Sequence, residues 1–209
     1  MTEKNDNEKS GAVIVVSFID GKTDIIIRGD EANTIYENGY FGTWLNETDL
    51  SLTNEELLLL VERNRIRVVE RQFDDEESEI PLSLEQLVNY FKKRNKEFWG
   101  QYLVYKDLRN RGYIVKVGTQ ITTPLRIYPR GGRPGDSVSK ITVFPFSEGS
   151  RIDLDFLDQI VSQARLNRKK LLLAVIDRLG DVTYYQVSEL ELKVNQLEYE
   201  YRDELERDM

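Results

Sequence analysis

Two β-branched runs open the patterned part of the chain. "AVIVVSF" (12–18) and "KTDIIIRG" (22–29) flank "IDG", a turn signal, so the pattern predicts a β-hairpin. Residues 29–69 then read as helical in two pieces. Asp30 is placed to cap the first piece, and Thr53 with Glu56 has capping-box spacing for the second. The apolar face of the second piece comprises Leu57, Leu58, Leu60 and Val61.

An acidic stretch interrupts this pattern. "FDDEESEI" (73–80) reads as a linker and is the best internal boundary. After it, Ser83 is placed to cap residues 84–112, which we expect to form two helices broken near Asn95 or Gly100.

From residue 113 onward the spacing of apolar and polar residues becomes typical of β-strands. The expected strands lie at 113–118, 125–130, 140–146, 170–176 and 182–187. They are interrupted by one helical stretch at 153–170, whose apolar residues recur at three- and four-residue steps: Leu154, Leu157, Ile160, Val161 and Ala164. The pattern therefore predicts an α+β fold, with a small N-terminal strand-and-helix domain followed by a mixed sheet flanked by helices. The expected divisions are a disordered tail (1–10), an N-terminal domain (11–94), a C-terminal domain (95–188) and an acidic, helical tail (189–209).

Composition excludes several kinds of site. The 209 residues include no cysteine and no histidine, which removes disulfides, thiolate metal sites, the commonest zinc ligand and the usual near-neutral proton shuttle. We expect no cofactor and no metal. The apolar runs are too short to span a bilayer, and the polar start "MTEKNDNEKSG" carries no signal region, so we expect a cytoplasmic protein with no membrane partner.

Charge is distributed unevenly along the chain. Residues 96–188 contain 15 Lys and Arg against 9 Asp and Glu, whereas the chain as a whole has a net charge of −8. The same region interleaves aromatic and basic residues, a combination that suits phosphates and unpaired bases. Scattered solvated charge is the alternative, but the gathering beside a glycine-rich loop favours RNA or DNA. The segment comprises Tyr105, Arg109, Arg111, Lys116, Arg126, Tyr128, Arg130, Arg133, Lys140, Arg165, Arg168, Lys169 and Lys170.

Four blocks of this region, in order, resemble the C-terminal domain of the archaeal tRNA-splicing endonuclease family. They are "YLVYKDLRNRGYIVKVG", "LRIYPRGGRPG", "ARLNRKKLLLAVID" and "GDVTYYQV", and the resemblance spans about 102–187. Upstream, "IYENGYFGTWLNETDLSL" is similar to the helical N-terminal domain of that family, in which a Y-x-x-G-x-x-G run precedes an L-S-L helix. The resemblance implies a nuclease-like C-terminal fold. It also implies metal-independent cleavage of pre-tRNA at bulge-helix-bulge introns, to 2′,3′-cyclic phosphate and 5′-hydroxyl ends.

The family's catalytic trio is tyrosine, histidine and lysine. By resemblance the tyrosine falls on Tyr128, the lysine on Lys169 and the histidine on Val138. Valine cannot transfer a proton, and no histidine exists elsewhere in the chain. Neighbouring family positions have also changed, to Gln120, Thr122 and Pro124. Tyr128 and Lys169 are therefore either remnants that still hold RNA or, as we favour, a packing aromatic and a cation near a helix C-terminus.

The charge pattern gives the expected RNA-binding residues, which are Arg126, Arg130, Arg133, Lys140 and Arg168. The resemblance implies assembly residues. In the family an acidic turn enters a basic cleft of the opposite dimer, and the following strand pairs subunits tail to tail. Here these features fall on Asp177, Asp181, Tyr184 and Tyr185, although an ordinary hairpin turn and an interior strand are the alternative.

The resulting hypothesis is a structural, non-catalytic subunit that forms a heterotetramer with a separate catalytic subunit and acts on pre-tRNA. One alternative is a self-sufficient endonuclease that uses Tyr128, Lys169 and a substitute proton donor. Another is an RNA-binding scaffold that has left splicing. A metal-dependent DNA nuclease is disfavoured, since no carboxylate-x-lysine pair for Mg²⁺ is evident.

Overall fold

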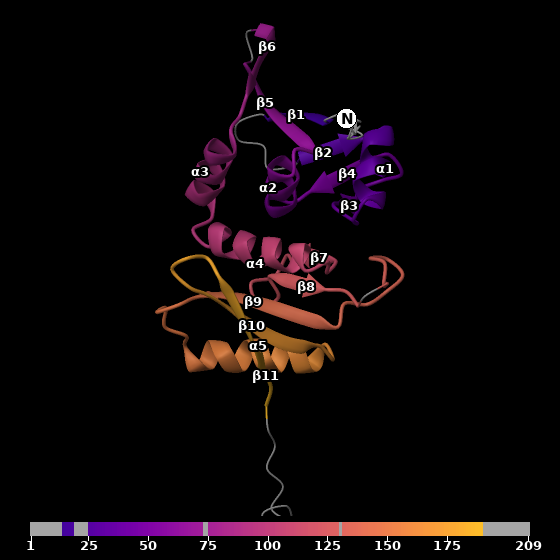
Figure 1. Ribbon diagram of the computed structural model, residues 1–209. Helices are drawn as coiled ribbons and strands as arrows, with labels where there is room; N and C mark the ends of the chain where they lie inside the picture. The colour runs from indigo at the N-terminus through magenta and orange to yellow at the C-terminus, as the bar shows by residue number, and fades with distance from the viewer. Residues whose placement is uncertain (1–13, 19–24, 73–74, 130, 190–209) are drawn as a thin grey trace, which may run out of the picture.

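A computed structural model describes residues 14–18, 25–72, 75–129 and 131–189. The α+β prediction is confirmed: the described chain has helices and three separate sheets, with the N-terminal half stacked on the C-terminal half (Figure 1). The predicted tail at 1–10 lies outside the described residues, as does all but the first residue of the tail predicted at 189–209. Within the described part of the chain, no helix is both long and apolar enough to cross a membrane.

Where the structure describes it, the N-terminal half contains two small sheets. One has the order β1 (Ile14–Phe18), β5 (Ile66–Gln72), β6 (Asp75–Pro81), and the other has the order β2 (Ile25–Arg28), β4 (Asp49–Leu52), β3 (Thr43–Trp44). The predicted hairpin is wrong, because β1 pairs in parallel with β5 and β2 pairs with β4. A β-branched composition favours strand formation, but it does not determine which strands pair. The pairing depends on which side chains pack together in the core.

The described residues of this half form three helices: α1 (Gly29–Glu37), α2 (Asn54–Glu62) and α3 (Leu84–Arg94). The Thr53–Glu56 capping box is confirmed, and Ser83 caps α3 in a second box with Gln86. Asp30 does not cap α1. That helix begins at Gly29, with Arg28 at the cap position, so Asp30 lies in its first turn.

Two segments differ from the prediction. The region between α1 and α2 is not continuous helix but contains β3 and β4, joined through Asn46, whose side-chain oxygen accepts bonds from the backbone N–H groups of Thr48 and Asp49, both at 2.8 Å. These side-chain bonds satisfy the backbone in a turn and so compete with helix formation. The acidic stretch is not a linker either. Most of it forms β6, which pairs antiparallel with β5.

The C-terminal half is one mixed sheet between two helices. Its order is β11 (Val182–Val187), β10 (Lys170–Ile176), β9 (Ile141–Ser147), β8 (Leu125–Ile127), β7 (Val115–Val117). β9 and β10 run parallel, and the remaining pairs run antiparallel. Helix α4 (Phe98–Asn110) packs on one face, and α5 (Leu154–Leu166) covers the other through Ile160 and Ala164. The predicted helix break near Asn95 is confirmed. Leu154, however, is 76% exposed instead of lying on the packed face.

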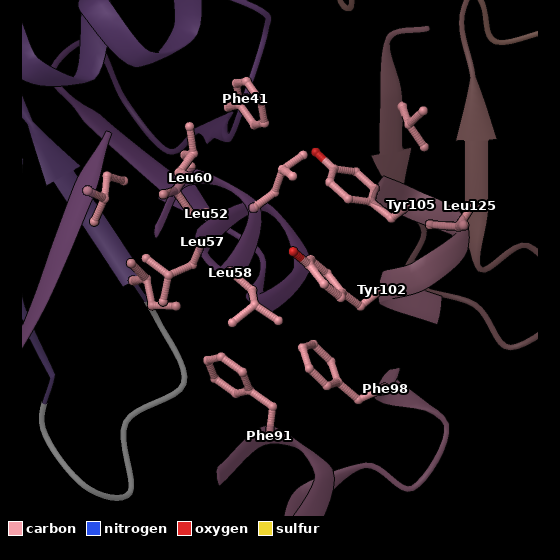
Figure 2. Close-up of a cluster of buried hydrophobic side chains, with 14 of the residues drawn as sticks. Phe41, Leu52, Leu57, Leu58, Leu60, Phe91, Phe98, Tyr102, Tyr105 and Leu125 are labelled. Atoms are coloured by element: carbon pink, nitrogen blue, oxygen red, sulfur yellow. The ribbon is translucent and has the colours of Figure 1, made fainter. Parts of the chain in front are cut away.

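One hydrophobic core connects the two halves. Figure 2 shows Leu57, Leu58 and Leu60 of α2 beside Tyr102 and Tyr105 of α4, whose hydroxyl ends point toward α2. The Y-x-x-G-x-x-G turn helps to close this seam. Gly39 has φ +136°, and an added Cβ would lie 2.9 Å from the Phe41 ring, so another residue would not fit. The Gly39 carbonyl accepts a 2.7 Å bond from Arg109 of α4.

Candidate functional site

The strand register brings the three predicted catalytic positions to one end of the C-terminal sheet. Tyr128 directly follows β8, and Lys169 directly precedes β10. Ile141 of β9 pairs with Ile127 on one side and Lys170 on the other, so Tyr128 and Lys169 flank the start of β9. The loop that carries Val138 leads into this start. The strand register is enough to bring these positions together. A catalytic role for them stays a prediction.

The glycine-rich loop between β8 and β9 is folded back on itself. Gly132 N–H donates to the Pro129 carbonyl at 2.9 Å, and Ser137 N–H donates to the Arg133 carbonyl at 2.8 Å. From the N-terminal half, the Tyr36 hydroxyl of α1 donates to the Pro134 carbonyl at 3.2 Å. The pKa of Tyr36 is raised, chiefly by burial and then by Tyr40 and other neighbours that include Tyr128. The loop is therefore anchored at its middle.

Val138 stands on the exposed side of this loop. Its side chain is 77% exposed, and it lies two residues before Lys140, whose backbone N–H donates to the Ile127 carbonyl at 3.2 Å. An exposed valine contributes nothing to the core and has no group that exchanges protons. The histidine position of the resemblance is therefore filled by an inert side chain that faces solvent.

The turn that ends α5 fixes the position of Lys169. Arg168 N–H donates to Arg165 O at 2.9 Å, and Lys169 N–H donates to Ala164 O at 2.8 Å, which is a Schellman motif. Arg168 occupies the left-handed position that glycine usually takes, with φ 53°. Burial, and then the neighbouring Arg126, lower the pKa of the half-buried Lys169. Lys169 thus lies three residues beyond the last residue of α5 and close to Arg126.

The predicted RNA-binding residues have different surroundings. Arg133, Lys140 and Arg168 are exposed at the same end of the sheet as Tyr128, and Arg126 is half-buried on β8. Arg130 lies outside the described residues. Three members of the broader basic-aromatic segment are buried and unavailable to nucleic acid: Tyr105, Arg109 and Lys116. Arg109 stacks on Phe41 at 3.9 Å, and Lys116 pairs with Glu56. Their positive charges therefore connect the two halves.

The predicted assembly turn uses one of its carboxylates internally. Asp177 Oδ1 accepts from the backbone N–H groups of Leu179 at 2.8 Å and Asp181 at 2.9 Å. Asp181 is exposed, and Leu179 at the tip is 88% exposed. What the turn presents outward is thus a leucine, flanked by Arg178 and Asp181. Asp177 is a turn-forming residue.

The last strand lies at the edge of the sheet. β11 pairs only with β10 among the described strands. Tyr185 is 56% exposed, whereas the Tyr184 hydroxyl donates to Asp107 of α4 at 2.7 Å. Burial and Asp107 raise the pKa of Tyr184. Tyr184 therefore holds the strand to its own chain, and Tyr185 is available to a second one.

A cleft of about 630 Å³ opens at the opposite end of the same sheet, lined by residues of the β7–β8 loop, α4 and the end of β9. Its charged lining residues are Glu55, Glu97 and Arg151, and burial raises the pKa of Glu55 to about 7. This lining is poorly suited to phosphate. The candidate site is therefore the basic end of the sheet around Tyr128.

Comparison with known proteins covers both halves. A model of the tRNA intron endonuclease N-terminal domain matches residues 21–79, and a model of the catalytic C-terminal domain matches residues 98–184. A tRNA-splicing endonuclease of Thermococcus gammatolerans is 34% identical over 174 residues, which cover 83% of this chain and 97% of the relative. One of Methanothermobacter thermautotrophicus is 36% identical over 157 residues, covering 75% and 86%. One of Methanococcoides burtonii is 32% identical over 182 residues, covering 87% of this chain and 49% of the relative. The chain therefore belongs to the tRNA-splicing endonuclease family.

Proposed function

We propose that this chain is a structural, non-catalytic subunit of a tRNA-splicing endonuclease, which assembles with a separate catalytic subunit to cleave pre-tRNA. The observation that carries the proposal is Val138, a solvent-facing valine at the histidine position in a chain that contains no histidine. RNA is held at the basic end of the sheet, where Arg133, Lys140 and Arg168 are exposed.

The chemistry explains why this position matters. The 2′-hydroxyl attacks the adjacent phosphorus and must lose its proton, while the departing 5′-oxygen must gain one. The lysine ammonium at Lys169 can stabilise charge on phosphate, and a tyrosine hydroxyl such as Tyr128 can donate a hydrogen bond. Neither is the near-neutral shuttle that a histidine supplies, and loss of such a group costs about 10²- to 10⁴-fold in rate.

Two exposed features, the outer edge of β11 and the turn before it, support a proposal for assembly. We propose that β11 pairs with the corresponding strand of a second subunit, and that the Leu179 turn contacts the opposite pair, which gives a heterotetramer. Support comes from the unpaired outer edge of β11 in the described sheet and from the exposure of Leu179.

Co-expression with a catalytic subunit tests this proposal. The two chains should purify as one complex that cleaves a bulge-helix-bulge RNA, whereas this chain alone should not cleave it. The substitution Val138→His tests whether a histidine at this position is what the chain lacks. It should restore measurable cleavage if Tyr128 and Lys169 remain in register, while Val138→Asn, of similar size, should restore none. Failure to associate with any catalytic subunit would overturn the structural-subunit proposal.

A further inference from the structure

The cleft at the far end of the C-terminal sheet from Tyr128 has a wall of fixed shape. Its volume of about 630 Å³ is typical of small-molecule sites. The loop between β7 and β8 forms one wall, in which Gly118 N–H donates to Pro124 O at 2.8 Å and Thr123 N–H donates to Gln120 O at 3.1 Å. A Cβ added to Gly118 would lie 1.8 Å from the carbonyl oxygen of Thr123, so the loop closes tightly on itself.

Much of the cleft lining is apolar. One residue of this lining, Ile121 of the β7–β8 loop, is 81% exposed. Apolar surface that stays in contact with water in a concave site favours a ligand with an apolar body. The apolar side chains that line the cleft are Val117, Ile121, Pro124, Phe144, Phe146 and Ile176.

A buried carboxyl group without a cation also lines this cleft. Glu55 in the first turn of α2 is only 5% exposed, and none of the ion pairs in the described part of the chain includes it. The adjacent Glu56, in contrast, pairs with Lys116. A buried carboxylate that lacks a positive partner is unfavourable in its ionised form, and a bound cation would relieve this cost.

The charges around Glu55 leave this need unmet. Lys116 is already held by Glu56 and by the Gly42 carbonyl. Arg151 lines the cleft but is exposed and forms no ion pair with Glu55. The titratable and charged groups that surround Glu55 are Glu56 on its own helix, Glu97 before α4, Tyr105 of α4, Lys116 of β7 and Arg151 before α5.

We propose that this cleft binds a small organic cation, an alkyl chain with an ammonium group at each end. One ammonium group pairs with the buried carboxylate of Glu55, and the methylene chain lies along the apolar lining. The second ammonium group pairs with Glu97, which is exposed in the same cleft. Such charge-assisted hydrogen bonds are stronger than neutral ones, and a buried carboxylate makes the inner one the stronger of the two.

Binding of this cation should be linked to the proton on Glu55. Burial raises the pKa of Glu55 to about 7, so its carboxyl group is mostly protonated at pH 6 and mostly ionised at pH 8. An alkylammonium group has a pKa of about 10 and stays charged throughout. Because only the ionised carboxyl attracts the cation, affinity should rise about tenfold from pH 6 to pH 8.

The test uses the full chain, with 1,4-diaminobutane as the probe and titration calorimetry as the measurement. Glu55→Gln should weaken binding at pH 8 by about tenfold or more, the usual effect of losing a charged hydrogen-bond partner, and should remove the pH dependence. Glu97→Gln should weaken binding of 1,4-diaminobutane several-fold but leave that of 1-aminobutane unchanged. Asp158→Asn is the matched control, because it removes an equal charge from an exposed residue of α5, and should change affinity less than twofold.

A second measurement follows Glu55 itself. The titration midpoint of its carboxyl ¹³C signal should move below its value in the free chain when 1,4-diaminobutane is in excess. An unmoved midpoint would overturn the assignment. Equal losses of affinity in Glu55→Gln and Asp158→Asn would also overturn it, since they would mean a diffuse attraction to the acidic chain.

Two further probes distinguish the source of the cation. Hexane-1,6-diol, which has a similar apolar body and no charge, should not bind detectably, and binding equal to that of the diamine would contradict a cation site. Nα-acetyl-lysine amide presents a single ammonium group and should bind more weakly than the diamine. Tighter binding of the lysine derivative would overturn the proposal of a free ligand, because it would indicate a lysine side chain of a partner protein.

Discussion

The ammonium group of Lys116 on β7 lies 3.1 Å from a carboxylate oxygen of Glu56 on α2, and both side chains are almost completely buried. Lys116 also donates to the Gly42 carbonyl. The second carboxylate oxygen of Glu56 accepts from Thr53 N–H at 3.0 Å, in the capping box of α2. One ion pair therefore joins the start of a helix in the N-terminal half to the sheet of the C-terminal half.

We expect Lys116→Met to lower the free energy of unfolding by about 3–5 kcal/mol, because it leaves the Glu56 carboxylate buried without its partner. Urea unfolding followed by tryptophan fluorescence measures the loss. Lys106→Met is the control: its pair with Glu62 is partly exposed, and its loss should cost about 1 kcal/mol or less. Adding Glu56→Gln to Lys116→Met should recover part of the stability. A Lys116→Met loss no larger than that of Lys106→Met would contradict this account.

Stability should fall as pH rises because of Glu55. Burial, opposed in part by hydrogen bonds and reinforced by Glu56, raises the pKa of Glu55 to about 7. The folded state therefore retains a proton that the unfolded state has lost, and the free energy of unfolding decreases from about pH 4.5 to about pH 7, by roughly 2–3 kcal/mol. Glu55→Gln should abolish most of this slope, whereas Glu97→Gln, at an exposed residue of the same cleft, should leave it. Identical slopes in the two variants would place the titration elsewhere.

Arg168→Gly should stabilise the protein by about 0.5–1 kcal/mol, because the left-handed conformation that costs a side chain roughly 1–2 kcal/mol costs glycine little. Arg168→Ala removes the same charge but keeps the strain, so it should change the melting temperature little. If alanine and glycine raise stability equally, the charge of Arg168 and not its backbone is responsible.

Local signals in the sequence predicted much of this fold. Both capping boxes depend on residues three apart, so Thr53 and Ser83 were predictable without any knowledge of the tertiary structure. The short β-rich runs of the C-terminal half likewise became strands, because each is bounded by turns. The pairing of β1 with β5 was not predictable in this way, since it joins residues about fifty positions apart that only the finished core brings together.

The sequence predicted where the site lies in the chain, but not which of its residues are buried or which partners they bind. Arg109 and Lys116 look like surface cations until Gly39, Glu56 and Gly42 are placed beside them. Asp177 looks like an outward-facing acid, but its carboxylate closes its own turn.

The turn after β10 should act on another subunit through its exposed residues. Leu179→Ser combined with Asp181→Asn should leave this chain folded and still paired through β11, but dissociate the larger assembly into dimers. Loss of such desolvated contacts typically costs about 2–5 kcal/mol, enough to weaken association at least tenfold. Light scattering of the mixed subunits measures the change.

Asp177→Ala is a necessary comparison, because it removes the acceptor of two turn hydrogen bonds and should lower the stability of the chain itself by about 1 kcal/mol. A full-size, active complex with the double variant would mean that the turn serves only its own hairpin.

Single-turnover cleavage of a bulge-helix-bulge RNA by the purified chain alone is the most direct measurement. With Val138 at the histidine position and no histidine anywhere in the chain, the account predicts no cleavage above the uncatalysed background at any pH between 5 and 9. Adding the catalytic subunit should then produce cleavage that depends on the tyrosine, histidine and lysine of that subunit, and that persists when this chain carries Lys169→Ala. Robust cleavage by this chain without a partner, abolished by Lys169→Ala, would contradict the account.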